Sequence, residues 1–197
     1  MSALLSSLNK KEKREIGLTD ENTVEIIMTN VLLILFWHFM MFCACKLLGQ
    51  DFFDYNKYTY AIKYWEDNGK WYSKRLKIKL WKDKLPQYVS KNGFSKKSFS
   101  SLNLEYIDNF IQETCRAEWV HKRCAWSIVP VFLLNNFAIG TVLSGLLLLI
   151  HLPFICIQRY NRIRLLRVRE KVLKLKKSAV NSEKIIKFVK NLEAVDS

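Results

Sequence analysis

The chain has 197 residues, enough for one domain of ordinary size, so no second domain is required. Its 32 basic and 18 acidic residues give a formal net charge of +14, which suits either nucleic acid or an anionic membrane surface. Half of all residues are hydrophobic, and their long runs favour the membrane. The five cysteines are odd in number and include no Cys-x-x-Cys pair, so neither a disulfide framework nor a zinc site is expected.

A polar tail, residues 1–22, precedes the first apolar helix. Residues 23–48 are nearly all apolar, and no short hydrophobic core with a small-residue cleavage site precedes them. We therefore predict a membrane helix or uncleaved anchor. His38 lies in its middle. An ionisable residue at such a place suggests a function, although a neutral histidine bonded to a neighbouring helix also fits.

Residues 49–118 form the main polar segment, which is rich in aromatic and basic side chains. Aromatic rings with interleaved lysines could stack nucleic-acid bases. Beside apolar segments they fit the aromatic belt of a membrane interface better, so we expect no nucleic acid partner. Asp67, Asn68 and Gly69 are a turn signal. The aromatic residues are Tyr55, Tyr58, Tyr60, Tyr64, Trp65, Trp71, Tyr72 and Trp81.

Within residues 75–82, basic and apolar side chains alternate as far as Leu80, and the apolar Trp81 and the basic Lys82 follow. A period of two is typical of a half-buried strand, or of a segment that lies on a surface with its lysines outward. Pro86 ends the segment because it lacks a backbone N–H and restricts Leu85. We therefore expect a small strand pair between Trp71 and Pro86.

A helix is predicted from about Leu104, with Asn103 as its N-cap. Continued at helical spacing, its apolar stripe reaches Glu118 and His121, two ionisable residues where the pattern requires core. Either the stripe has drifted and both face water, or they form a site in which the carboxylate orients the imidazole and raises its basicity. The stripe begins with Ile107, Phe110, Ile111 and Thr114.

Residues 119–158 are predicted to form a membrane hairpin. Residues 124–134 are apolar but short and contain a proline, and Asn135 and Asn136 then interrupt the run. The apolar residues 137–157 follow, about the length that a helix needs to cross a bilayer. We expect a mainly α integral membrane protein with about three membrane-associated helices and a small interfacial α(+β) segment between the first and second.

A hairpin places residues 49–118 and the basic C-terminal helix or tail, residues 159–197, on the same side of the membrane. Because basic residues collect on the inner side, that side is predicted to be cytoplasmic, in a multi-pass protein of the cell membrane. The first helix then leaves its own basic N-terminal tail outside. The sequence does not resolve this conflict.

Polar residues follow the second long apolar run directly. His151, Ile155, Gln158 and Arg162 share one helical stripe, so a polar face could run from within the membrane to its surface. The arginines here could equally anchor the helix to lipid headgroups.

Four short segments are KLWKDKLP at 79–86, FSKK at 94–97, ETCRAEWVH at 113–121 and QRYNRIRL at 158–165. Their order and spacing resemble the glycosyl-4,4'-diaponeurosporenoate acyltransferase family of staphyloxanthin-type carotenoid biosynthesis. The likeness covers roughly residues 50–166, whereas the first helix is similar only in kind and the tail beyond Arg169 is additional.

Two positions depart from the family pattern. The pattern has tryptophan after the histidine of the third segment, where this chain has Lys122. It has asparagine seven residues before the glutamine of the fourth segment, where this chain has His151. The first departure concerns local packing, and the second concerns the polar face below Gln158.

The resemblance implies an integral membrane enzyme that esterifies a sugar hydroxyl of a glycosylated carotenoid, or of a related glycolipid, with a fatty acyl group. It implies membrane lipids, the acceptor and an acyl donor as partners. Acyl-CoA or another acyl thioester is the expected co-substrate, with no further cofactor.

Such a reaction needs a base for the alcohol proton, donors for the oxyanion and cations for the phosphates of the donor. We assign the base to His121, oriented by Glu118. No Gly-x-Ser-x-Gly elbow or activated cysteine is evident, so direct transfer is expected. A second histidine and a third ligand are lacking, so no metal is expected. Arg159, Arg162 and Lys82 are candidates for the phosphate or oxyanion clamp, Gln158, Tyr160 and Asn161 for sugar or carbonyl ligands, and Asp83 and Arg116 are further binding candidates.

The alternative function is that of a non-catalytic small membrane protein or subunit. In that case the basic tail binds anionic lipid or a partner, and Glu118 and His121 are a buried structural pair. Convergence of Glu118, His121, Arg159 and Asn161 on a cavity open to the bilayer would distinguish the enzyme from this alternative.

Overall fold

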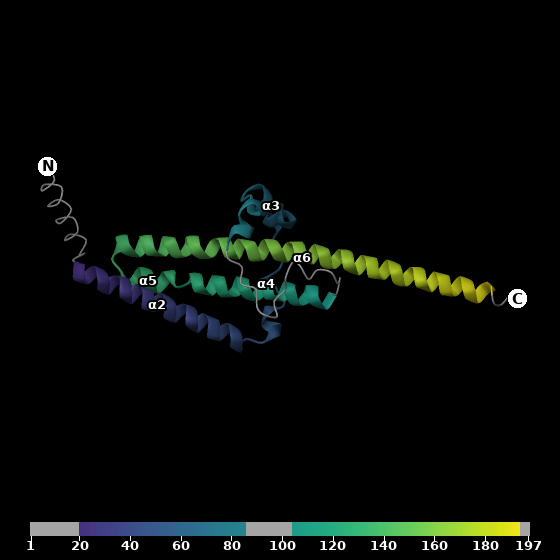
Figure 1. The fold of residues 1–197 in the computed structure, drawn as a ribbon, viewed down its shortest axis with the longest axis horizontal. Coiled ribbons are helices and arrows are strands. Elements are labelled where there is room, and N and C mark those ends of the chain that lie inside the picture. Colours follow the sequence, from purple (N-terminus) through teal and green to yellow (C-terminus); the bar gives the residue numbers. More distant parts are fainter. Residues whose placement is uncertain (1–19, 86–103, 194–197) are drawn as a thin grey trace. The chain divides into compact units, whose positions relative to one another are not determined.

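The computed structural model describes residues 20–85 and 104–193, and over these residues it is mostly helical (Figure 1). It divides into two units, each treated by itself below. The first comprises Met1–Leu47 and Arg123–Ile150, and the second Leu48–Lys122 and His151–Ser197. Most of the predicted polar tail, the predicted N-cap Asn103 and the segment at 94–97 lie outside the described residues.

The first unit contains the long apolar helices. α2 (Asp20–Leu47) matches the predicted first helix, and α6 (Phe137–Glu193) begins in this unit with the second apolar run. Among the described residues, these two helices are long and apolar enough to cross a membrane. The expected third helix is shorter, because α5 (Ile128–Leu134) has seven residues where a crossing needs about 20.

Paired amides join α2 to the end of α5. Asn30 Nδ2 donates to Asn135 Oδ1 at 2.9 Å, and Asn135 Nδ2 donates to Asn30 Oδ1 at 2.8 Å. Each amide also donates to a carbonyl one turn earlier, at Ile26 and Val131. Polar groups among apolar helices need such partners, because no water is at hand to replace them.

The predicted interruption at Asn135 and Asn136 is confirmed. α5 ends just before it, and the Asn136 side chain accepts a hydrogen bond from the Ile139 N–H at 3.0 Å in the first turn of α6. Gly140 allows the return, because a Cβ there would lie 3.0 Å from the Phe132 carbonyl oxygen. The Nδ1 of His38 donates to the Ile34 carbonyl, one turn earlier in its own helix, at 2.7 Å.

The second unit packs short helical turns against α4 and the later part of α6. The predicted helix from Leu104 is confirmed as α4 (Leu104–Ala125). Ahead of it come η1 (Gln50–Phe53), η2 (Tyr64–Gly69), α3 (Lys70–Lys74), η3 (Ile78–Leu80) and η4 (Lys82–Lys84).

The strand pair predicted between Trp71 and Pro86 is wrong, since residues 71–85 form helical turns. Lys77 has φ 46° and ψ 38°, a left-handed conformation that stops an extended chain. The alternating pattern did not reflect two faces either: Ile78 is buried, Leu80 is 70% exposed and Lys82 is buried. Packing of single side chains outweighed the strand pattern.

The turn predicted at Asp67, Asn68 and Gly69 is confirmed. All three residues have positive φ angles, of 42°, 50° and 83°. A Cβ on Gly69 would lie 3.3 Å from Cγ2 of Ile163 on α6, so the turn needs glycine both for its backbone and for its close approach to the helix.

An antiparallel seam between α4 and α6 carries the site. At one end Ile107 and Ile111 pack with Leu165 and Val172 in a shared apolar cluster. Farther along α4 the stripe turns polar at Thr114 and Glu118, as the sequence pattern predicted, and the positions remain buried. The side chains that α6 presents there decide what the polar residues contact.

Candidate functional site

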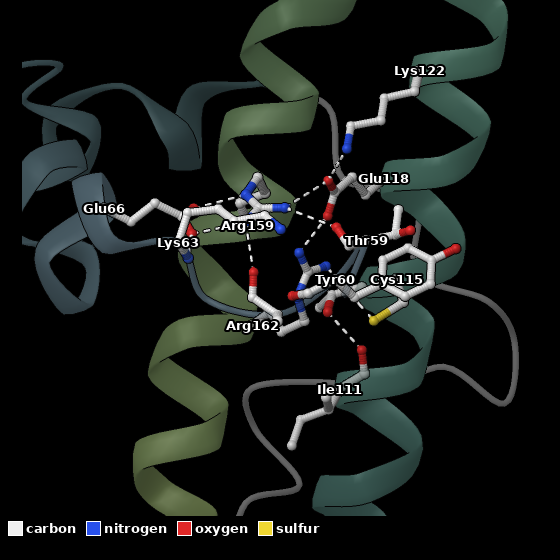
Figure 2. A network of polar contacts seen from close by, with 12 residues as sticks. Thr59, Tyr60, Lys63, Glu66, Ile111, Cys115, Glu118, Lys122, Arg159 and Arg162 are labelled. Atoms are coloured by element: carbon white, nitrogen blue, oxygen red, sulfur yellow. Dashed lines mark hydrogen bonds and ion pairs between the residues drawn. The ribbon is translucent and has the colours of Figure 1, made fainter. Parts of the chain in front are cut away.

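Two carboxylates and two guanidinium groups form a buried cluster in the second unit (Figure 2). Glu66 comes from η2, Glu118 from α4, and Arg159 and Arg162 from α6. Both carboxylates are fully buried, and the arginines are 7% and 1% exposed. Charges in such a place require partners of opposite charge, because each loses its hydration.

Arg159 lies at the centre of the cluster, between the two carboxylates in Figure 2. Its Nε and Nη2 donate to the two oxygens of Glu66, each at 2.7 Å. Its Nη1 donates to Glu118 at 3.0 Å, and Nη2 also donates to the Ala61 carbonyl at 3.1 Å. Arg159 therefore joins three segments that are far apart in the sequence.

Arg162 and Lys122 complete the surroundings of Glu118. Arg162 donates to one Glu118 oxygen and to the Tyr60 carbonyl at 3.1 Å, and Lys122 forms an ion pair with the other Glu118 oxygen from one turn further along α4. Burial raises the pKa of Glu118, but Arg162, Lys122 and the other arginine lower it more, so the net pKa is below its ordinary value. Lys122, where the family pattern has tryptophan, serves here as a counter-charge.

Glu66 is held by neutral donors as well. The Tyr72 hydroxyl donates to it at 2.7 Å and the Lys63 backbone N–H at 2.6 Å. Burial raises the pKa of Glu66, but the hydrogen bond from Arg159 and these donors bring it below its usual range. Burial also raises the pKa of Tyr72, so its hydroxyl remains a donor.

Cys115 contacts the same cluster, since Arg162 Nη1 lies 3.7 Å from its sulfur. Burial raises the pKa of the Cys115 thiol to about 11, in spite of the nearby guanidinium. Near neutral pH it is a thiol and a poor nucleophile.

His121 lies one turn beyond Glu118 on α4 and is half-buried. Its ring stacks on that of Phe154, with centroids 4.8 Å apart and planes 7° apart. The His151 ring lies 5.8 Å away at a tilt of 51°. His151 and Phe154 are one turn apart on α6, so this helix presents two rings to His121.

The other residues predicted after the second apolar run have mixed surroundings. Gln158 and Asn161 are half-buried on α6. Tyr160 belongs to an apolar cluster with Tyr72 and Ile163. Gln158 and Asn161 are thus partly accessible, whereas Tyr160 is buried.

The remaining predicted site residues have their ion pairs elsewhere. Lys82, 5% exposed, pairs with exposed Asp83 at 2.7 Å. Arg116 pairs with Glu113 at 2.9 Å and lies over the Phe53 ring, 5.1 Å from its centroid. The structure brings Glu118 together with the two arginines of α6. Lys82, Asp83 and Arg116 have partners outside this cluster.

Sequence reasoning missed Glu66 and Phe154. Glu66 directly precedes the turn of Asp67 and Asn68, but no periodicity marked it as buried. The one available signal for Phe154 was its spacing of three residues from His151.

A cavity of about 420 Å³ lies near the other half of α4. None of the residues predicted as site residues lines it. Among the described residues, no group of three or more histidine, cysteine or acidic side chains could hold a metal ion. The cavity is lined by Asp51, Asp54, Tyr55, Lys57, Asp108, Asn109 and Gln112.

The model of a protein family described as glycosyl-4,4'-diaponeurosporenoate acyltransferase matches residues 50–171, a range that contains the ion cluster, His121 and the two rings beside it. The chain belongs to this family. Proteins with the same name from Staphylococcus aureus strains MRSA252 and N315 are each 30% identical over 105 residues. The match covers 51% of this chain and 61% of the length of each relative. No solved structure matches.

Family membership confirms the resemblance predicted from the four segments and supports an acyltransferase. It does not favour the non-catalytic alternative. The matched range begins after α2, so this helix lies outside it.

Proposed function

We propose that the protein is a membrane acyltransferase that esterifies a sugar hydroxyl of a glycosylated carotenoid, or of a related glycolipid, with a fatty acyl group. The observation that carries this proposal is the family match over residues 50–171, which contains the half-buried His121 beside a buried ion cluster. The name of the Staphylococcus aureus relatives suggests the acceptor class.

In the proposed reaction, His121 accepts the proton of the sugar hydroxyl through a ring nitrogen. The hydroxyl oxygen attacks the carbonyl carbon of an acyl thioester, and the C–S bond then breaks. The thiolate leaves with the proton that the imidazolium returns. No acyl group is held on Cys115, whose raised pKa makes it a poor nucleophile.

For the ion cluster we propose a positioning role in place of the phosphate clamp predicted from the sequence. Arg159 and Arg162 are buried, and their donors engage Glu66, Glu118 and backbone carbonyls. A phosphate would have to displace a carboxylate to reach them. The cluster instead fixes α4 against α6 one turn from His121, which leaves Gln158 as a candidate sugar or carbonyl ligand.

The site is proposed to lie at the cytoplasmic face of the cell membrane in a multi-pass protein. The chain leaves the second unit after Lys122 and returns to it at His151. The contact of Glu118 with Arg162 joins the part of the chain just before Lys122 to the part just after His151. This contact supports placing both parts on one side of the membrane. The exposed basic side chains of α6 after Arg162 support the inner side.

Comparison of cellular lipids tests the proposed function. Lipid extracts of cells that make the glycosylated acceptor, with and without this protein, are compared by mass spectrometry. We expect a new species heavier by one fatty acyl group, and the His121→Ala variant should form it about 10² to 10⁴ times more slowly. His38→Asn, a histidine of the first unit, is the matched control. Activity of His121→Ala within tenfold of the parent protein would remove the base assignment.

A further inference from the structure

The His121 ring has two aromatic neighbours on α6. Phe154 covers its face in a parallel stack at 4.8 Å, and His151 lies 5.8 Å away. Both neighbours come from one face of one helix, and the ion cluster fixes that helix against α4 one turn away. The orientation of His121 is therefore set by rings whose backbone positions are themselves fixed.

Burial decides which of the two imidazoles takes a proton. His151 is 5% exposed, whereas His121 is half-buried. Because burial disfavours the charged form of a histidine, the more exposed ring of His121 is the better candidate for taking a proton. A neutral imidazole is a strong dipole that can turn its unprotonated nitrogen toward a positive charge.

Phe154 also favours the protonated form of His121. The face of an aromatic ring carries partial negative charge and attracts a cation stacked on it. When His121 becomes an imidazolium, the parallel Phe154 ring stabilises it. The uncharged His121 gains less from the same contact.

Charged groups of both signs meet at Glu118, one turn from His121 on α4. Glu118 on α4 favours the imidazolium, whereas Lys122 on α4 and Arg159 on α6 disfavour it. Since Glu118 pairs with both cations, its net effect on His121 is reduced. The two rings of α6 are neighbours of His121 that can favour its protonated form.

We propose that His151 and Phe154 form a ring cradle that positions His121 and makes it a stronger base. This inference rests on the proposed function, in which His121 takes the sugar proton. His151 is a positioning residue and remains neutral while the proton moves to His121 and back.

Imidazole NMR of the full chain in detergent micelles tests the cradle without any activity measurement. The chain has three histidines, so removal of each one assigns its signal. We expect His121 to titrate with pH while His151 stays neutral. His151→Phe and Phe154→Leu should each lower the titration midpoint of His121 by about half a pH unit or more. His38→Asn should leave it unchanged.

A His121 midpoint that stays the same or rises in both variants would overturn the cradle, and a rise would mean that His151 carries the first proton. Acyl transfer is measured separately against pH. With His151→Phe, the acidic limb of the profile should move to lower pH and the plateau rate should fall, which a purely structural defect would not do. If His121→Ala keeps full activity while the NMR shifts are as expected, the proposed function fails and the cradle stands.

Discussion

Arg159 and Arg162 show how the surroundings of a residue decide its role. In the sequence both follow an apolar run, where arginine is predicted to contact lipid headgroups or a substrate phosphate. In the folded chain both are buried and bonded to carboxylates. Arg164, two residues after Arg162, is exposed and is the better candidate for a headgroup contact.

Glu118 should be essential for the stability of the second unit. Glu118→Ala leaves Arg159 and Arg162 without a shared carboxylate, and breaking a buried ion pair in this way costs about 3–5 kcal/mol. Unfolding in detergent, followed by tryptophan fluorescence against denaturant, measures the change. Glu113→Ala is the matched control, because this half-exposed carboxylate of the same helix pairs with Arg116 and should change stability by less than about 1 kcal/mol. Equal effects of the two substitutions would contradict the central role of Glu118.

The same cluster predicts acid sensitivity. The pKa values of Glu66 and Glu118 are lower in the folded chain than the ordinary 4.5. Their contribution to stability is therefore complete above the unfolded pKa of about 4.5, and it is lost as the pH falls through the folded values. The denaturant concentration at the unfolding midpoint, measured at a series of pH values from 7 downward, should decrease once the pH is below about 4.5. In Glu118→Gln this fall should be smaller, and a fall of the same size would rule out Glu118 as a cause.

At the scale of elements, the turn after Glu66 packs the aromatic segment against α6. Asp67, Asn68 and Gly69 reverse the chain with positive φ angles, which places Glu66 at Arg159 and Tyr72 in the apolar cluster with Tyr160. The turn was predictable because Asn-Gly signals act locally. Its contact with α6 was not.

Gly69→Ala tests this turn. Alanine at φ 83° is strained, and its Cβ would lie 3.3 Å from Ile163, so we expect a loss of stability of about 1 kcal/mol or more. Gly49→Ala is the matched control, because Gly49 has φ −64° and nothing lies within 4 Å of a Cβ there. Thermal unfolding of both variants in detergent gives the comparison. A Gly69→Ala protein as stable as Gly49→Ala would show that the turn can relax.

At the scale of the whole molecule, the two candidate spans set where the protein resides. Their side chains are largely exposed over the apolar stretches of α2 and of early α6. So much apolar surface is unfavourable in water but suits the acyl chains of a bilayer. The acceptor and the fatty acyl group, both lipids in the proposed reaction, would then share this phase with the enzyme.

An alkaline carbonate wash of isolated membranes tests this association. Peripheral proteins held by charge are released by the wash, whereas a protein with apolar spans stays in the pellet. We expect the full chain to stay with the membranes at both low and high salt, detected by immunoblot against a peripheral marker protein. Release by carbonate would mean that the basic residues, and not α2 and α6, hold the protein at the membrane.

The sequence by itself determined the features whose signals are local. These are the two apolar runs, the break at Asn135 and Asn136, the turn at Gly69, and the apolar stripe of α4 with the polar residue Glu118 in it. Composition and periodicity suffice for these, because each depends on neighbours within a few turns of the same segment. The family was also predictable from four spaced segments.

The partners of those residues were decided only by the tertiary structure. That Glu118 serves two arginines and Lys122, that Glu66 joins them, and that His121 lies against Phe154 and His151 all depend on the register of α4 against α6. Sequence periodicity tells which face of a helix is buried but not which residues of another helix it meets. For the same reason the alternating pattern within residues 75–82 misled: a strand needs a partner strand, and none occurs among the residues that the structure describes.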